Sequence, residues 1–143
     1  MLKNTQLVLI ALTASLSYLP FNAQASCNDF RVTVQNTSSN VWTIGNINVI
    51  QGQLLISPAN TIPANQSVDI DFSSSWMHGP DVYITIINGN SAELLHAKQN
   101  YCLFEAGNIN AWSLPGKYLA HTNDTIGSYK TSSAGKSLFT IHN

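Results

Sequence analysis

Charged side chains are scarce in this chain. Lys and Arg together number 6 and Asp and Glu together 7 in 143 residues, so 9% of residues are charged and the formal net charge is −1. Binding to nucleic acid requires a basic patch that neutralises phosphates, and electrostatic binding to anionic lipid requires clustered Lys and Arg. The composition argues against both modes. The uncharged polar residues Asn, Ser and Thr keep the protein in solution instead. They provide an abundant surface that can form hydrogen bonds without charge.

Familiar catalytic and metal-binding motifs are also missing. The sequence has no G-x-S-x-G, H-E-x-x-H or C-x-x-C, which are typical of serine hydrolases, zinc proteases and zinc or redox sites. Gly135-Lys136-Ser137 resembles the end of a phosphate-binding loop, but Lys130 stands where that loop needs its first glycine. We therefore predict no cofactor and no metal, and we favour a non-enzymatic protein. The four histidines are scattered along the chain: His78, His96, His121 and His142.

One pair of carboxylates keeps an enzymatic alternative open. Asp69 and Asp71 are two residues apart on a predicted strand, so they project from the same face. Such a pair can serve as acid and base in glycoside hydrolysis or can bind calcium. A charged strand face that is simply solvated is the plainer interpretation. The alternative hypothesis is a small secreted or periplasmic enzyme whose dispersed site combines these carboxylates with His78.

Only one segment is strongly apolar, and it lies at the N-terminus. Leu7–Leu19 is too short to span a bilayer comfortably and is followed by Pro20. Ala23-Gln24-Ala25 then has the small residues that signal peptidase requires. This pattern predicts a signal peptide over residues 1–25, cleaved after Ala25, and a secreted or periplasmic protein. Residues 26–143 are enough for a single domain, with no further transmembrane segment.

Cysteine is rare, and both copies lie in the exported part. Cys27 and Cys102 allow only one intramolecular pairing, and an oxidising compartment favours it. Two free thiols or a catalytic cysteine are the alternatives. Cys27 would be next to the new N-terminus, which suits a staple better than a nucleophile. We predict one disulfide, Cys27–Cys102, which joins the mature N-terminus to the β-sheet.

The clearest element is a β-hairpin over Asp81–Ala97. Its first arm is almost entirely β-branched or aromatic, and Asn88-Gly89-Asn90 tolerates the positive φ angles of a tight turn. The alternation of side chains predicts that Ile84 and Ile86 are core residues and that Val82 shares their face. We expect the other strands to assemble around this hairpin.

Further strands are indicated by alternation and by turn residues. The first carries Phe30, Val32 and Val34 on one face, and no segment has a convincing helical period. The stretch Glu105–Gly116 is expected to be irregular, and Thr122-Asn123-Asp124 is expected to be a turn. The fold class predicted is all-β: a single antiparallel β-sandwich, or a flattened barrel, of about eight short strands. The other expected strands are 41–50 with a break at Gly45, 53–57, 67–72, 101–104, 117–121, 125–129 and 137–142.

The tryptophans suggest where a ligand binds. Trp42 lies in a predicted strand and is expected in the core, whereas Trp76 and Trp112 lie in polar segments expected to be loops. An indole at a loop tip can stack on a sugar, anchor at a membrane interface or act as a hot spot for a protein partner. Neighbouring Asn side chains can bond to sugar hydroxyls. Alternatively, both indoles fold inward and cap the sandwich. The predicted binding residues are Trp76, His78, Asn108, Asn110 and Trp112.

Two families offer resemblances. The run Val34–Phe72, with Gly52 and the segment 62–67, resembles the small β-sandwich cytolysins of the aegerolysin and actinoporin kind over about a third of the mature chain. The basic, aromatic-rich membrane face of those families has no clear counterpart here, so no functional residue is carried over. Pilin-like subunits of chaperone–usher systems are also exported, β-rich and joined by one disulfide. However, Cys27 and Cys102 are spaced more widely, and the C-terminus lacks their aromatic penultimate residue.

Three hypotheses follow. The leading one is a secreted, non-enzymatic recognition module for a glycan, a cell surface or a protein partner. The second is the small enzyme with a dispersed His and Asp site, and the third is a structural or assembly subunit that exchanges a strand. Fold class does not choose among them, because function depends on the site.

Overall fold

A computed structural model describes residues 29–74, 78–100, 107–128 and 133–143. The predicted signal peptide, both cysteines, Trp76 and the strand expected over 101–104 lie outside the described residues. Among the described residues, no helix is long and apolar enough to cross a membrane.

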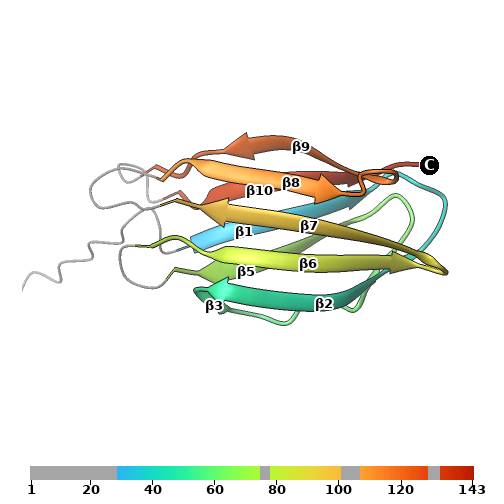
Figure 1. Cartoon of the computed structure of the whole chain (residues 1–143), viewed down its shortest axis with the longest axis horizontal. Coiled ribbons are helices and arrows are strands. Elements are labelled where there is room, and N and C mark those ends of the chain that lie inside the picture. The colour runs from blue at the N-terminus through green and yellow to red at the C-terminus, as the bar shows by residue number, and fades with distance from the viewer. Residues whose placement is uncertain (1–28, 75–77, 101–106, 129–132) are drawn as a thin grey trace, which may run out of the picture.

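The described residues form ten β-strands in two five-stranded sheets, which confirms the all-β class. The strands of both sheets run along the long axis of the molecule (Figure 1). The first sheet contains, in spatial order, β3 (Gln53–Leu54), β5 (Ser67–Ser73), β1 (Asp29–Asn36), β10 (Gly135–Ile141) and β9 (Leu119–Thr125). The second contains β4 (Thr61–Ile62), β2 (Trp42–Gln51), β6 (Asp81–Asn88), β7 (Ser91–Gln99) and β8 (Ile109–Leu114).

The hairpin predicted at the centre of the sequence is β6 and β7. Asn88 pairs with Ser91, and Gly89 between them has a φ of 56°, the left-handed region that favours glycine. Val82, Ile84 and Ile86 are all fully buried, as the alternation predicts. The hairpin therefore supplies two neighbouring strands of the second sheet and much of its inner face.

Both sheets direct apolar side chains into one shared core. Phe30, Val32 and Val34, expected on one face of the first strand, are buried, and the break expected at Gly45 is a register shift between Ile44 and Asn46. A Cβ at Gly45 would lie 2.6 Å from Ile87 Cδ1, so a larger residue would clash there. The buried apolar residues are Phe30, Val32, Val34, Trp42, Ile44, Ile62, Ile70, Phe72, Val82, Ile84, Ile86, Leu95, Ala97, Leu119, Phe139 and Ile141.

The prediction of a purely antiparallel sandwich is wrong at one pair of strands. β1 and β10 run parallel, with Phe30 opposite Gly135 and Asn36 opposite Ile141. A parallel pair needs a long connection, and here almost the whole domain lies between the two strands. Alternation of apolar residues is the same in both directions, so the sequence pattern carries no signal for strand direction.

The C-terminal region also differs from expectation. The segment expected to be irregular contains strand β8, and strand β9 continues through the turn expected at residues 122–124. Because β9 ends at Thr125, the strand expected over 125–129 is not formed at residues 126–128. Both strands lie at an edge of their sheet. Edge strands commonly carry polar residues that discourage association with other chains. Thr122 and Asn123, which the sequence suggested as turn residues, are therefore exposed residues of an edge strand.

Candidate functional site

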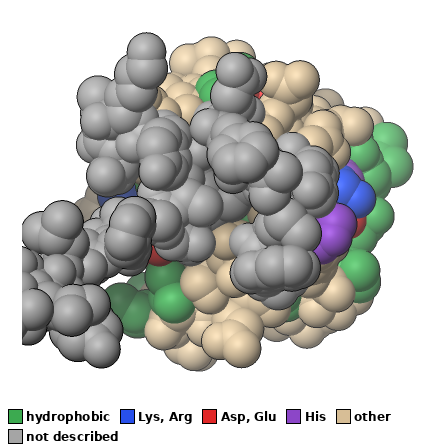
Figure 2. Space-filling view, turned by 90° about the vertical axis from the view of Figure 1, so that its left-hand side faces the viewer, with side chains coloured by type: hydrophobic (Ala, Val, Ile, Leu, Met, Phe, Trp, Pro, Cys, Tyr) green, Lys and Arg blue, Asp and Glu red, His purple; other side chains and the backbone are tan. Residues whose placement is uncertain are grey.

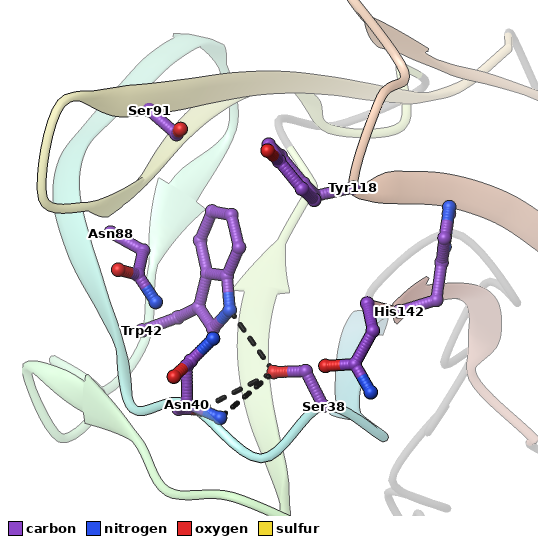
Figure 3. Close-up of a pocket in the computed structure, with 8 residues that line it drawn as sticks. Ser38, Asn40, Trp42, Asn88, Ser91, Tyr118 and His142 are labelled. Atoms are coloured by element: carbon purple, nitrogen blue, oxygen red, sulfur yellow. Dashed lines mark hydrogen bonds between the residues drawn. The ribbon is translucent and has the colours of Figure 1, made fainter.

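A pocket of about 230 Å³ opens at the end of the sandwich where the chain terminates. The C-terminus and the turn between β6 and β7 both lie at the right-hand end in Figure 1. Figure 3 shows that the pocket side chains come from segments far apart in sequence. We call it the Trp42–Tyr118 pocket; its lining residues are Ser38, Asn40, Trp42, Asn88, Ser91, Tyr118, His142 and Asn143.

Asn36 fixes the loop between β1 and β2 that forms one wall. Its side chain is fully buried. Nδ2 donates to the carbonyl oxygens of Asn40 at 2.7 Å, Ile62 at 3.0 Å and Pro63 at 3.0 Å. Oδ1 accepts from Ser38, both from its backbone N–H at 3.0 Å and from its hydroxyl at 2.7 Å. One amide thus satisfies groups from two loops and sets the conformation of the wall.

Trp42 forms the aromatic part of the same wall. Only 3% of its surface is exposed, which confirms the prediction that it is a core residue. Its Nε1 donates to the Ser38 hydroxyl at 3.2 Å, and Asn88 Nδ2 donates to the Val41 carbonyl at 3.2 Å. The indole therefore packs in the core and also lines the pocket with one edge. The sequence gives no signal for that second role.

Tyr118 stands opposite Trp42, with ring centroids 5.7 Å apart and ring planes at 54°. Lys117 Nζ lies 4.8 Å from the Tyr118 ring centroid. A hydrogen bond with Lys117, and then the charge of that residue, lower the pKa of the Tyr118 phenol. The pocket therefore combines two aromatic rings with amides and hydroxyls, and it has one cation at its rim.

Two other polar clusters resemble catalytic groups but lack the required geometry. In the first, His121 Nε2 lies 2.9 Å from Asp124 Oδ1, and the Ser137 hydroxyl donates to the same oxygen at 2.8 Å. A nucleophilic serine must instead donate to the histidine that activates it. Here the carboxylate stands between the two other groups, so the cluster links β9 to β10 and does not activate Ser137.

In the second cluster, Arg31 holds both carboxylates that the sequence singled out. Its Nε and Nη2 bond to Asp71 at 2.6 and 2.9 Å, and Nη1 lies 3.0 Å from Asp69. The hydrogen bond to Asp71 raises the pKa of Arg31 despite its partial burial. A carboxylate pair whose oxygens are occupied by a guanidinium is a poor site for a cation. In the described part of the chain, no group of three or more His, Cys, Asp or Glu residues could hold a metal ion.

Three of the predicted binding residues lie at the other end of the second sheet. His78 precedes β6, Asn108 precedes β8, and Asn110 lies opposite Lys98; all three predicted residues are exposed. The Trp42–Tyr118 pocket lies instead at the β6–β7 turn. The structure thus gathers these three residues near one end of the sheet but separates them from the pocket.

Trp112 lies in strand β8 rather than at a loop tip, which corrects the sequence-based assignment. Its side chain is half-buried on the outer face of the sheet. The ring centroids of Trp112 and His96 are 4.9 Å apart, and those of His96 and Tyr83 are 4.4 Å apart. These residues are partners across three neighbouring strands. Trp112 is therefore neither a loop anchor nor a lid on the core but one member of an aromatic row.

A small charge cluster adjoins this aromatic row. Asp81 lies 2.8 Å from His96 Nε2 and 2.9 Å from Lys98 Nζ. Burial alone would raise the pKa of Asp81, but hydrogen bonds from Lys98 and His96 outweigh it and lower the pKa. Figure 2 shows histidine, lysine and acidic side chains beside hydrophobic ones at the right-hand edge of this end of the molecule.

Neither the protein-family models nor the curated proteins give a match to this sequence. Several solved structures share the fold. The lipid-binding protein Nakanori has a TM-score of 0.61 at 7% identity, over 81% of this chain and 71% of that one. IP-1A from Alcaligenes faecalis has a TM-score of 0.55 at 8% identity, covering 84% and 95%. RahU, solved in complex with a Tris molecule, has a TM-score of 0.63 at 12% identity, covering 83% and 97%.

These neighbours are too different in sequence to transfer a site. They establish a shared small β fold, and one of them is a lipid-binding protein. The likeness to a lipid-binding protein loosely fits the prediction of a binding module. The pocket residues have no distinctive sequence signal, because Ser38 and Asn40 lie in a polar stretch typical of a turn and Tyr118 lies in a short predicted strand.

Proposed function

We propose that this protein is an exported, non-enzymatic recognition module that binds a neutral, hydroxyl-bearing head group, such as a sugar ring, at a cell surface. The lining of the Trp42–Tyr118 pocket carries this proposal. The Tyr118 ring suits the apolar face of a sugar ring, Trp42 adds an aromatic edge, and the uncharged amides and hydroxyls of Asn40, Asn88 and Ser91 suit its hydroxyl groups. The volume of about 230 Å³ lies below the roughly 300–1,000 Å³ of drug-sized sites. One head group fits that size better than a long glycan.

Two further observations support a ligand displayed on a surface. Val41 and Leu114 are each 56% exposed. Val41 adjoins Trp42, and Leu114 begins the turn that leads to Tyr118, so both apolar side chains lie at the pocket end of the molecule. Exposed apolar residues around a polar pocket suit an interaction surface. The lipid-binding neighbour is consistent with a head group carried by a lipid.

Replacing Tyr118 by alanine should weaken ligand binding and leave folding intact. The side chain is half-buried and packs only at the border of the core, so its loss should lower stability without preventing folding. Flotation with phosphatidylcholine vesicles, with and without a neutral glycolipid, measures binding. We expect a loss of about tenfold, which corresponds to about 1.4 kcal/mol. Tyr83→Ala is the matched control, because Tyr83 lies on the outer face of the second sheet. Equal binding by wild type and Tyr118→Ala would refute the pocket as the site.

The same assay tests the second candidate surface, which comprises the predicted residues His78, Asn108, Asn110 and Trp112. Exposed Asn108 and Asn110 near an aromatic row favour it. Under the pocket proposal, Asn110→Ala should bind the glycolipid vesicles as the wild type does. If Asn110→Ala loses binding while Tyr118→Ala keeps it, recognition belongs to this second surface.

The proposed export also predicts the disulfide Cys27–Cys102, whose two residues lie outside the described ranges. The exported chain should begin at Ser26, and its thiols should resist alkylation until a reductant is added. Intact-mass spectrometry with and without reduction measures both features. Two alkylated cysteines before reduction would contradict the pairing, and a retained N-terminal segment would contradict the cleavage.

A further inference from the structure

Glu93 is a buried acidic residue with an unusual set of partners. It lies on the inward face of β7, with 2% of its surface exposed. Carboxylates are rarely buried unless they are paired. Oε2 accepts the N–H of Gly116 at 2.9 Å, and Oε1 accepts the N–H of Tyr118 at 3.0 Å. The two oxygens of one carboxylate therefore bind two backbone donors of the same turn.

This turn joins β8 to β9 and carries one wall of the pocket. Gly116 adopts a φ of 73°, which glycine tolerates without strain. The Ser113 hydroxyl donates to the Leu119 carbonyl at 2.7 Å and closes the base of the turn. Hydrogen bonds to a charged acceptor are about twice as strong as neutral ones. The Glu93 carboxylate is therefore the strongest acceptor that the described residues offer to this turn.

The backbone of Tyr118 is held from both sides. Glu93 accepts its N–H, and its carbonyl accepts the N–H of His142 at 2.8 Å. With both peptide groups fixed, the side chain can direct its ring toward Trp42 and keep its contact with Lys117. Glu93 does not itself line the pocket.

We infer that Glu93 is a positioning residue for ligand binding, which acts by fixing the turn that places Tyr118 in the pocket. This inference rests on the proposed function, because it names the residue on which the geometry of that site depends. A buried carboxylate that never touches the ligand thereby sets the affinity for the head group.

Glu93→Gln is the sharpest test because it preserves shape. Glutamine offers one carbonyl oxygen, so it satisfies only one of the two N–H donors, and its NH₂ group faces the other donor. We expect binding to the neutral-glycolipid vesicles to weaken by about tenfold, or about 1.4 kcal/mol. Glu93→Asp keeps the charge but has a shorter reach. It should weaken binding to a smaller extent and serves as a second variant if glutamine prevents folding.

The phenol of Tyr118 provides a readout that does not depend on a ligand. Its pKa is lowered by the hydrogen bond and charge of Lys117, whereas the charge of Glu93 raises it. Removing the Glu93 charge alone would therefore lower the pKa further. If the turn loosens, the Lys117 contact weakens and the pKa should instead rise toward its ordinary value, so the two effects have opposite signs. Ultraviolet titration of each protein minus its Tyr118→Phe counterpart isolates this phenol from the other tyrosines. Asp29→Asn controls for the change in charge, because Asp29 is exposed and does not line the pocket.

The outcomes separate the two proposals. If no protein binds the vesicles but the Tyr118 pKa rises in Glu93→Gln, the positioning role stands and the proposed ligand is wrong. If the wild type binds and a folded Glu93→Gln binds equally well with a Tyr118 pKa that does not rise, the positioning role is overturned and the proposed function stands. The same result from folded Glu93→Asp would overturn it if the glutamine variant does not fold.

Discussion

Replacing Ile86 by alanine is expected to lower the free energy of unfolding by about 2–5 kcal/mol, the range for deleting a buried aliphatic side chain. Ile86 is fully buried in the middle of the second sheet. Its removal forfeits the transfer free energy of the lost atoms and leaves a cavity in a core shared by two sheets. Chemical denaturation with urea measures the change, and an unchanged m-value would show that the comparison concerns stability alone.

Ile50→Ala is the matched control because it removes the same atoms from a side chain that is 61% exposed. It should change stability by no more than about 0.5 kcal/mol. The contrast tests strand register, since a slip of one residue moves every inward side chain to the outer face. A loss below about 0.5 kcal/mol for Ile86→Ala would mean that the inward face of β6 is assigned wrongly.

Local sequence patterns predict the elements whose signals are local. The β6–β7 hairpin needs only alternating residues and a turn at Gly89, so its position and buried face follow directly from the sequence. The bulge at Gly45 follows from one glycine within a strand. In both cases the determining residues lie within a few positions of the feature, so a reading along the chain finds them.

Long-range features have no comparable signal. The parallel pairing of β1 with β10 depends on where the last strand inserts, and β8 and β9 lack strong alternation because they lie at sheet edges. The candidate site is harder still to predict. Its lining joins Ser38, Asn88, Tyr118 and Asn143 from four segments, and each residue looks like ordinary loop or strand polarity. In the sequence, Glu93 looks like a surface residue of a half-exposed strand. Only the structure shows that its carboxylate binds the backbone of a distant turn.

Asn36 is the residue whose replacement should affect both the fold and the site. Asn36→Ala is expected to cost about 3 kcal/mol of stability, because an unpaired buried polar group costs about 1–3 kcal/mol and several lose this partner together. The groups affected are the carbonyls that its Nδ2 contacts and the N–H and hydroxyl of Ser38. Ser38 in turn accepts the bond from Trp42 Nε1, so binding to the neutral-glycolipid vesicles should fall as well.

Two further variants identify the cause of that loss. Asn48→Ala removes an exposed asparagine from β2 and should change stability by no more than about 0.5 kcal/mol. Asn36→Asp keeps an acceptor for Ser38 but removes the Nδ2 donor and adds a buried charge, so it should be destabilised at least as much as the alanine variant. Urea unfolding and vesicle flotation on the same preparations measure both effects. If Asn36→Ala unfolds at the wild-type midpoint, the loop between β1 and β2 does not depend on this amide, and Trp42 is positioned by core packing alone.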